Sequence, residues 1–83
     1  MRGTIQYINP FTGLVAALTT DGAFSVFELV SGRAEAGDSV SWAGDCPFGA
    51  DTVRNLTQTL LLDVVFKNHN VAVTQLGRLM GVR

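Results

Sequence analysis

The sequence predicts an all-β domain, and two features of residues 3–30 lead to this prediction. The segment contains three short runs rich in Val, Ile, Thr and aromatic residues, which favour the pleated surface of a sheet. Turn-forming pairs separate the runs, with Asn9-Pro10 after the first and Asp21-Gly22 after the second. We therefore expect an antiparallel meander with strands at residues 3–8, 13–19 and 23–30.

Two further strands are predicted after this meander. In residues 39–42, Val40 and Trp42 alternate with two serines, which places both apolar side chains in the core. Residues 52–57 form the other strand, after a turn-rich loop at 45–51 that contains Cys46. The chain has 83 residues, of which 47% are hydrophobic, so we expect one domain with a modest core.

The C-terminal segment contains a dense apolar run at residues 60–66, which we predict to be a sixth strand. These side chains need cover on a soluble protein, so we expect the run to pair with a barrel edge or with the same segment of a second chain. Residues 71–80 place apolar side chains at helical spacing between Asn70, a candidate N-cap, and Gly81. The alternative is a hairpin that pairs residues 64–67 with 71–74.

The predicted strands resemble the bacterial cold-shock domain family. The resemblance rests on several short matches: Gly3-Thr-Ile-Gln-Tyr-Ile-Asn9, Gly13, Asp21-Gly22, Val26-Phe27, Val40-Ser41-Trp42 and Arg54-Asn55-Leu56. It implies a small five-stranded antiparallel OB-like barrel at residues 1–57. It also implies binding of single-stranded RNA or DNA, and it leaves residues 58–83 as a C-terminal extension.

The resemblance also implies a set of residues that contact nucleic acid. Tyr7 and Phe27 occupy positions where the family stacks bases, provided that a bulge turns Tyr7 to the open face. Asn9 ends the opening family motif, and Arg2 and Arg54 are the expected phosphate contacts. The function implied is weak binding of a single strand, led by stacking.

One strand face supports an alternative function. Leu14 and Ala16 stand where the family has two exposed Phe side chains, and Leu18 lies on the same face. Such an aliphatic stripe marks a protein contact more often than a nucleic-acid platform. The protein is then an interaction or oligomerisation module, with this face covered by its own C-terminal segment or by a partner. The candidate interface residues are Leu14, Leu18, Leu60, Leu62, Val64 and Phe66, and the candidate partner is a second copy of the chain.

The charge distribution disfavours strong binding of polyanions. The formal net charge is −1. Residues 1–57 carry three basic and six acidic residues, a balance of −3, whereas residues 58–83 carry three basic and one acidic, a balance of +2. Because binding to phosphate backbones normally draws on clustered Lys and Arg, we expect any nucleic-acid affinity to come from stacking or from the C-terminal segment.

No enzyme, metal or cofactor is predicted. The single histidine, His69, lies in an Asn-His-Asn break without Cys, Asp or Glu at ligand spacing, so we expect a solvated turn residue. No serine lies in a nucleophile motif, and no glycine pattern matches a phosphate loop. The lone Cys46, together with the lack of an apolar leader or of a run of about 18 apolar residues, predicts a cytoplasmic protein without a membrane span.

Overall fold

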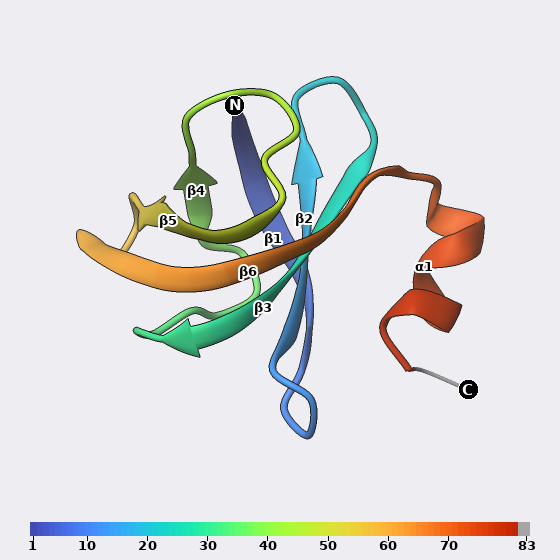
Figure 1. Ribbon diagram of the computed structural model, residues 1–83, viewed down its shortest axis with the longest axis horizontal. Helices are drawn as coiled ribbons and strands as arrows, with labels where there is room; N and C mark the ends of the chain where they lie inside the picture. The colour runs from blue at the N-terminus through green and yellow to red at the C-terminus, as the bar shows by residue number, and fades with distance from the viewer. Residues whose placement is uncertain (82–83) are drawn as a thin grey trace.

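The computed structural model describes residues 1–81, which form a closed β-barrel with one short helix (Figure 1). The elements are β1 (Arg2–Asn9), β2 (Leu14–Thr19), β3 (Phe24–Ser31), β4 (Ser39–Ser41), β5 (Gly49–Asn55), β6 (Leu60–Val71) and α1 (Val73–Leu79). Around the barrel the strand order is β1-β2-β3-β6-β5-β4, with β4 pairing back to β1. Every neighbouring pair is antiparallel. The all-β prediction is therefore confirmed.

The strand β6 is part of the barrel wall. It pairs with β3 on one side and with β5 on the other, so residues 1–57 do not close a barrel by themselves. The barrel accordingly has six strands in the described residues instead of the five predicted. The expectation that the apolar run pairs with other barrel strands is confirmed, but the boundary drawn after residue 57 has no counterpart in the sheet. Positions 82 and 83 of the predicted extension lie outside the described residues.

A register shift in β1 separates its inward from its outward residues. Ile5 pairs with Ala17, whereas Tyr7 pairs with Ala16, so one extra residue of β1 lies between these two pairs. As a result Ile5 is 1% exposed inside the barrel, while Tyr7 lies outside and is 52% exposed. The bulge expected to turn Tyr7 to the open face is therefore present.

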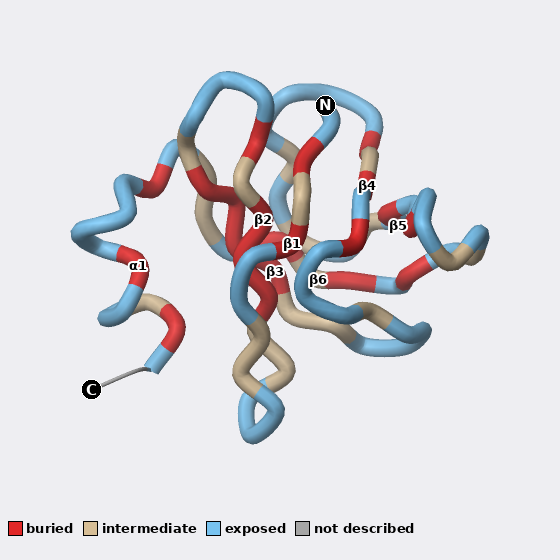
Figure 2. Tube along the Cα trace, turned by 180° about the vertical axis from the view of Figure 1, so that it is seen from behind, coloured by how far each residue is buried: buried red, intermediate tan, exposed pale blue. Residues whose placement is uncertain are grey.

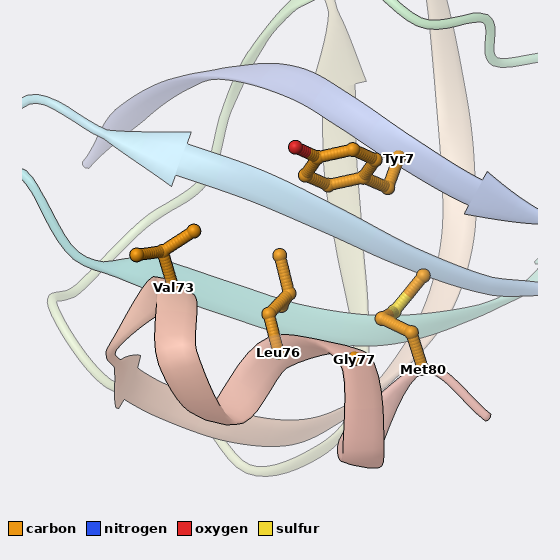
Figure 3. Close-up of a pocket in the computed structure, with 5 residues that line it drawn as sticks. All are labelled: Tyr7, Val73, Leu76, Gly77 and Met80. Carbon is orange, nitrogen blue, oxygen red and sulfur yellow. The ribbon is translucent and has the colours of Figure 1, made fainter. Parts of the chain in front are cut away.

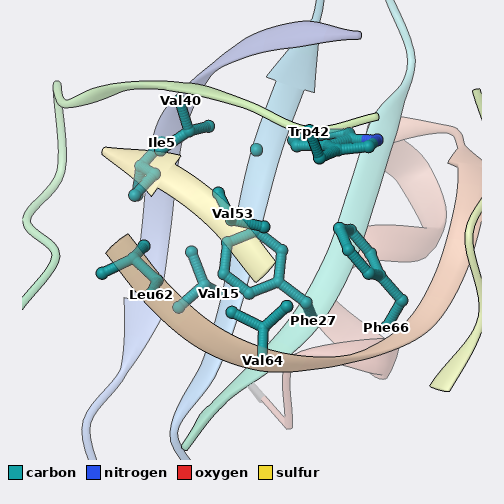
Figure 4. Close-up of a cluster of buried hydrophobic side chains, with 10 residues drawn as sticks. Ile5, Val15, Phe27, Val40, Trp42, Val53, Leu62, Val64 and Phe66 are labelled. Atoms are coloured by element: carbon teal, nitrogen blue, oxygen red, sulfur yellow. The ribbon is translucent and has the colours of Figure 1, made fainter. Parts of the chain in front are cut away.

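The barrel interior is filled by side chains from every strand and from the residue after β4. We call this set the inner core: Ile5, Val15, Ala17, Phe27, Val40, Trp42, Val53, Leu62, Val64 and Phe66 (Figure 4). Phe27, Trp42 and Phe66 pack together there, with ring centroids 5.2 to 6.5 Å apart. The predicted burial of Trp42 is confirmed.

A second apolar group lies outside the barrel, under α1. We call it the outer cluster: Ala16, Phe24, Val26, Val71, Leu76 and Met80. Since the helix covers the outer face of β2 and β3, these strands are buried on both faces over much of their length (Figure 2). Burial on both faces explains why their sequences are nearly continuous apolar runs.

The predicted helix is confirmed, but its start differs from the prediction. Residues 64–71 all belong to β6, so the alternative hairpin does not form. Asn70 does not cap the helix; it is the penultimate residue of β6 and has a φ of 55°, a left-handed conformation that Asn tolerates. The N-cap residue is Ala72, which makes no side-chain capping bond. Gly81 has a φ of 73° and follows the C-cap Met80, as expected for a helix end.

A buried carboxylate fastens the loop before β4 to the turn between β5 and β6. Asp38 Oδ2 accepts hydrogen bonds from Asn55 Nδ2 at 2.8 Å, Gln58 Nε2 at 2.8 Å and the Glu35 N–H at 2.9 Å. Burial raises the pKa of Asp38, but the three hydrogen bonds outweigh burial and hold that pKa below its ordinary value. The folded state therefore favours the ionised carboxylate.

Candidate binding site between Tyr7 and helix α1

A pocket lies outside the barrel between Tyr7 and α1 (Figure 3). It has a volume of ≈ 240 Å³, and its other lining residues are Val73, Leu76, Gly77 and Met80. The side chains of Val73, Leu76 and Met80 project from the helix toward the strands, with the Tyr7 ring opposite them. Gly77 adds no side chain between them. We call this site the Tyr7 pocket.

The helix lies along β3, with β2 between β3 and β1, and it runs in the same direction as β1 (Figure 3). Val71, just before α1, pairs with Phe24 on β3. Phe24 pairs with Leu18 on β2, and Leu18 pairs with Thr4 on β1, so the residue before the helix is level with Thr4. At the other end of the helix, Asn9 Nδ2 donates a hydrogen bond of 2.7 Å to the Met80 carbonyl oxygen. This bond ties the end of the helix to the end of β1, so the Tyr7 pocket lies between two fixed walls.

Of the two predicted stacking residues, the structure leaves only Tyr7 accessible. Phe27 is 0% exposed, because its position in β3 points into the barrel, and its ring packs against Phe66 and Trp42. The prediction that Phe27 stacks on a base is therefore wrong. The aromatic neighbour of Tyr7 is Phe24, with ring centroids 6.3 Å apart, but Phe24 is itself buried under α1.

Asn9 has a structural role that the sequence did not indicate. Its Nδ2 binds the Met80 carbonyl, and its Oδ1 accepts a hydrogen bond of 3.0 Å from the Phe11 N–H. Both ends of the amide are therefore engaged within the chain, which argues against the predicted contact with nucleic acid.

The two predicted phosphate contacts, Arg2 and Arg54, lie in one row of paired residues across three neighbouring strands. Arg2 pairs with Ser41 across β1 and β4, and Ser41 pairs with Arg54 across β4 and β5. Directly paired residues share a sheet face, and both arginines are exposed. In residues 1–81 the one ion pair joins Lys67 to Glu28 at 3.5 Å. Neither Arg2 nor Arg54 thus has a carboxylate partner within the described chain.

The predicted interface residues divide into two groups. Leu14 and Leu18 are partly buried against the outer cluster, where the chain's own helix provides the cover. Leu62, Val64 and Phe66 belong to the inner core, so the prediction that they form an intermolecular interface is wrong. Alternation along β6 explains this, since every second side chain points inward. Leu60 is partly buried against the same core.

His69 is a packed residue rather than the solvated turn residue predicted. Its Nε2 lies 2.6 Å from the Pro47 carbonyl oxygen, which can only accept, so Nε2 carries the proton. In the neutral ring Nδ1 then accepts from Ser25 Oγ at 2.8 Å. The ring also stacks on Phe66, with centroids 5.2 Å apart. His69 therefore fastens the loop between β4 and β5 to β3, a role that no local sequence motif signals.

Several other site classes find no support in the described residues. Residues 1–81 contain no group of three His, Cys, Asp or Glu side chains that could hold a metal ion. The part of the chain that the structure describes has no helix long and apolar enough to cross a membrane. Comparisons with models of protein families, with curated proteins and with solved structures find no match.

Proposed function

We propose that the protein is a non-catalytic protein-interaction module that binds an apolar side chain of a partner protein in the Tyr7 pocket. The observation that carries this proposal is that α1 covers the outer cluster only in part. The helix buries the outer cluster but leaves beside it an apolar pocket whose rim residues, Tyr7 and Val73, are 52% and 64% exposed. Partly open apolar surfaces of this kind favour a binding site.

The size of the pocket favours one side chain as its occupant. Sites for small molecules commonly measure about 300–1,000 Å³, and the Tyr7 pocket is smaller, at ≈ 240 Å³. In protein interfaces, a few side chains that fill well-packed pockets contribute most of the binding energy, and aromatic residues are enriched among them. The fixed walls favour this use, because β1 and the end of α1 are joined by the Asn9–Met80 hydrogen bond.

Single-stranded nucleic acid is a less well supported ligand. The face implied by the cold-shock resemblance is covered by α1, and Phe27 and Phe24 are both buried. Of the two predicted stacking residues only Tyr7 is accessible. One ring contributes about 1–3 kcal/mol of stacking, which corresponds by itself to a dissociation constant above about 1 mM.

The test is a selection of random dodecapeptides, displayed on phage, against the full chain. We expect the enriched peptides to share an aromatic or branched apolar residue. The Gly77→Leu variant fills the pocket, and we expect it to weaken binding by roughly 30-fold or more, the loss of about 2 kcal/mol typical of a hot spot. Gln75→Leu adds the same side chain elsewhere on the exposed helix surface and should leave binding unchanged.

Two results contradict this proposal. One is equal binding of the selected peptides to wild type and Gly77→Leu, when circular dichroism shows both to be folded. The other is low-salt binding of a single-stranded oligonucleotide that Tyr7→Ser removes. That second result favours the nucleic-acid function.

A further inference from the structure

We infer that the partner segment also carries a carboxylate, which binds between Arg2 and Arg54 about four residues away from the apolar side chain in the Tyr7 pocket. This inference rests on the proposed function and specifies the chemistry of the partner. The partner is an extended peptide segment with one apolar anchor and one acidic side chain on the same face.

The arginine row provides the acidic subsite. Arg2 and Arg54 flank Ser41, with β4 as the single strand between theirs, which separates their Cα atoms by about 10 Å. The inward neighbours Val40 and Asn55 are buried, so the row faces outward. The short side chain of Ser41 leaves room between two long side chains that end in guanidinium groups. A planar guanidinium group favours a carboxylate, to which it can donate two parallel hydrogen bonds.

The carboxylate of Asp63, on the strand next to that of Arg54, does not neutralise this row. Asp63 lies on β6, where it is paired with Thr52 and is therefore diagonal to Arg54, about 7–8 Å away across the strands. Its Oδ2 accepts a hydrogen bond of 2.7 Å from Ser31 Oγ on the side of β3. The residue paired with Arg54 on β6 is the exposed Leu61. The two guanidinium groups are thus available to an external carboxylate.

The distance between the two subsites sets the spacing in the partner. Tyr7 and Arg2 are both exposed on β1. Because of the register shift they lie opposite Ala16 and Thr20, which are four positions apart, so the span along the strands is about 13 Å at ~3.3 Å per residue. A second concavity, of ≈ 380 Å³, lies along this path and is lined in part by Arg2, Thr4 and Leu18. An extended peptide spans about 13 Å in four residues, and its alternate side chains return to the same face at that spacing.

The charges favour a peptide over a nucleic acid as the occupant. Two arginines match one or two carboxylates, whereas a polyanion meets a chain whose formal net charge is −1. The path from Arg2 to the pocket also contains Thr4 and Leu18 and no further cation among its lining residues. A peptide with one apolar and one acidic side chain therefore fits this surface better than a nucleic acid, which carries a phosphate at every nucleotide.

The experiment examines the peptides that lose binding to Gly77→Leu. We expect an Asp or Glu four positions from the apolar anchor, in either direction. The double variant Arg2→Ser/Arg54→Ser should then weaken binding of such a peptide roughly tenfold, given about threefold for each exposed ion pair. A peptide with Gln in place of the acid should bind wild type as weakly as it binds the double variant. Arg33→Ser, which removes an exposed arginine in the loop before β4, is the matched control and should change nothing.

The possible failures are distinguishable. Pocket-dependent peptides without an acidic preference, or unaffected by the arginine variants, would overturn this inference and leave the proposed function standing. The absence of any pocket-dependent peptide would overturn both. Low-salt binding of an oligonucleotide that the double arginine variant abolishes would assign the row to phosphates and likewise overturn the inference.

Discussion

The inner core and the outer cluster lie on opposite faces of β2 and β3, and they differ in how they are enclosed. The inner core is surrounded by strands on every side, and most of its side chains are less than 3% exposed. The outer cluster is covered by α1 alone, and the Tyr7 pocket opens beside Leu76 and Met80. The same two strands thus support a closed region and a partly open one.

This difference separates stability from binding. A closed core stabilises the fold but offers no surface to a partner, so the aromatic residues inside the barrel cannot recognise a ligand. The cover of the outer cluster is a single short helix, and the apolar residues at its rim remain accessible. Under the proposed function, the inner core contributes to stability alone, whereas the open side of the outer cluster is also accessible to a partner.

The largest expected effect is that of Phe27→Ala. Truncating a buried Phe costs about 3–5 kcal/mol, which is comparable to the net stability of a domain of this size. We expect global unfolding or a sharply lowered unfolding midpoint in urea, rather than a selective loss of binding. Phe27→Leu retains most of the volume and should remain folded. If Phe27→Ala unfolds at the same urea concentration as wild type, the Phe27 ring does not belong to the closed core.

Leu76→Ala provides the comparison on the other face of the same strands. Leu76 is 4% exposed, but it borders the Tyr7 pocket, so water can enter the space left by the truncation. We expect a cost near the lower end of the range for Leu truncation, about 2 kcal/mol. If urea unfolding shows a larger loss of unfolding free energy for Leu76→Ala than for Phe27→Ala, the helix contributes more to stability than the inner core. That result would contradict the distinction between the two regions.

The sequence was sufficient to predict where the strands lie, but not which of their side chains point into the barrel. Turn pairs such as Asp21-Gly22 and the alternation around Val40 and Trp42 are local signals, and both are confirmed by the structure. The inward position of Phe27 depends on register shifts between β3 and β6, which are set by packing across the barrel. A strand pattern of period two cannot predict such a shift, because a slip of one residue exchanges the two faces.

The candidate site was predictable only in part for a related reason. Helical spacing indicated that residues 71–80 form an apolar helix, and the stripe of Leu14, Ala16 and Leu18 indicated a covered surface. The contact between these two surfaces is non-local. The Asn9–Met80 hydrogen bond and the row from Arg2 to Arg54 join residues far apart in the chain, so no motif records them.

An intermediate effect is expected from Asp38→Asn, which tests what holds the loop over one end of the inner core. The variant loses the charge that accepts three hydrogen bonds, at a cost of about 1–3 kcal/mol. Because the folded-state pKa of Asp38 lies below its ordinary value of 3.8, the carboxylate stabilises the fold fully above that value. The stabilisation is then lost as the pH falls through the lower, folded-state pKa.

The measurement is urea unfolding of wild type and Asp38→Asn between pH 7 and pH 2. The difference in unfolding free energy should stay constant down to about pH 5 and shrink below about pH 4. Ser39→Ala, at an exposed neighbouring position, controls for local change in the loop. A difference that persists undiminished at the lowest pH would show that ionisation of Asp38 does not stabilise the loop.

The smallest effect is expected from Gly77→Ala, and it has the opposite sign. Gly77 is an exposed position in α1, and replacing Gly by Ala within a helix contributes about 0.5–1 kcal/mol. The added methyl group borders the Tyr7 pocket without filling it, so the cover over the outer cluster should become more stable while peptide binding persists. Hydrogen exchange should slow in α1 and remain unchanged in the inner strands, because the helix opens locally without unfolding the barrel. Equal slowing in β5 and β6 would mean that helix and barrel unfold as one unit, which would contradict the distinction between the closed and the partly open region.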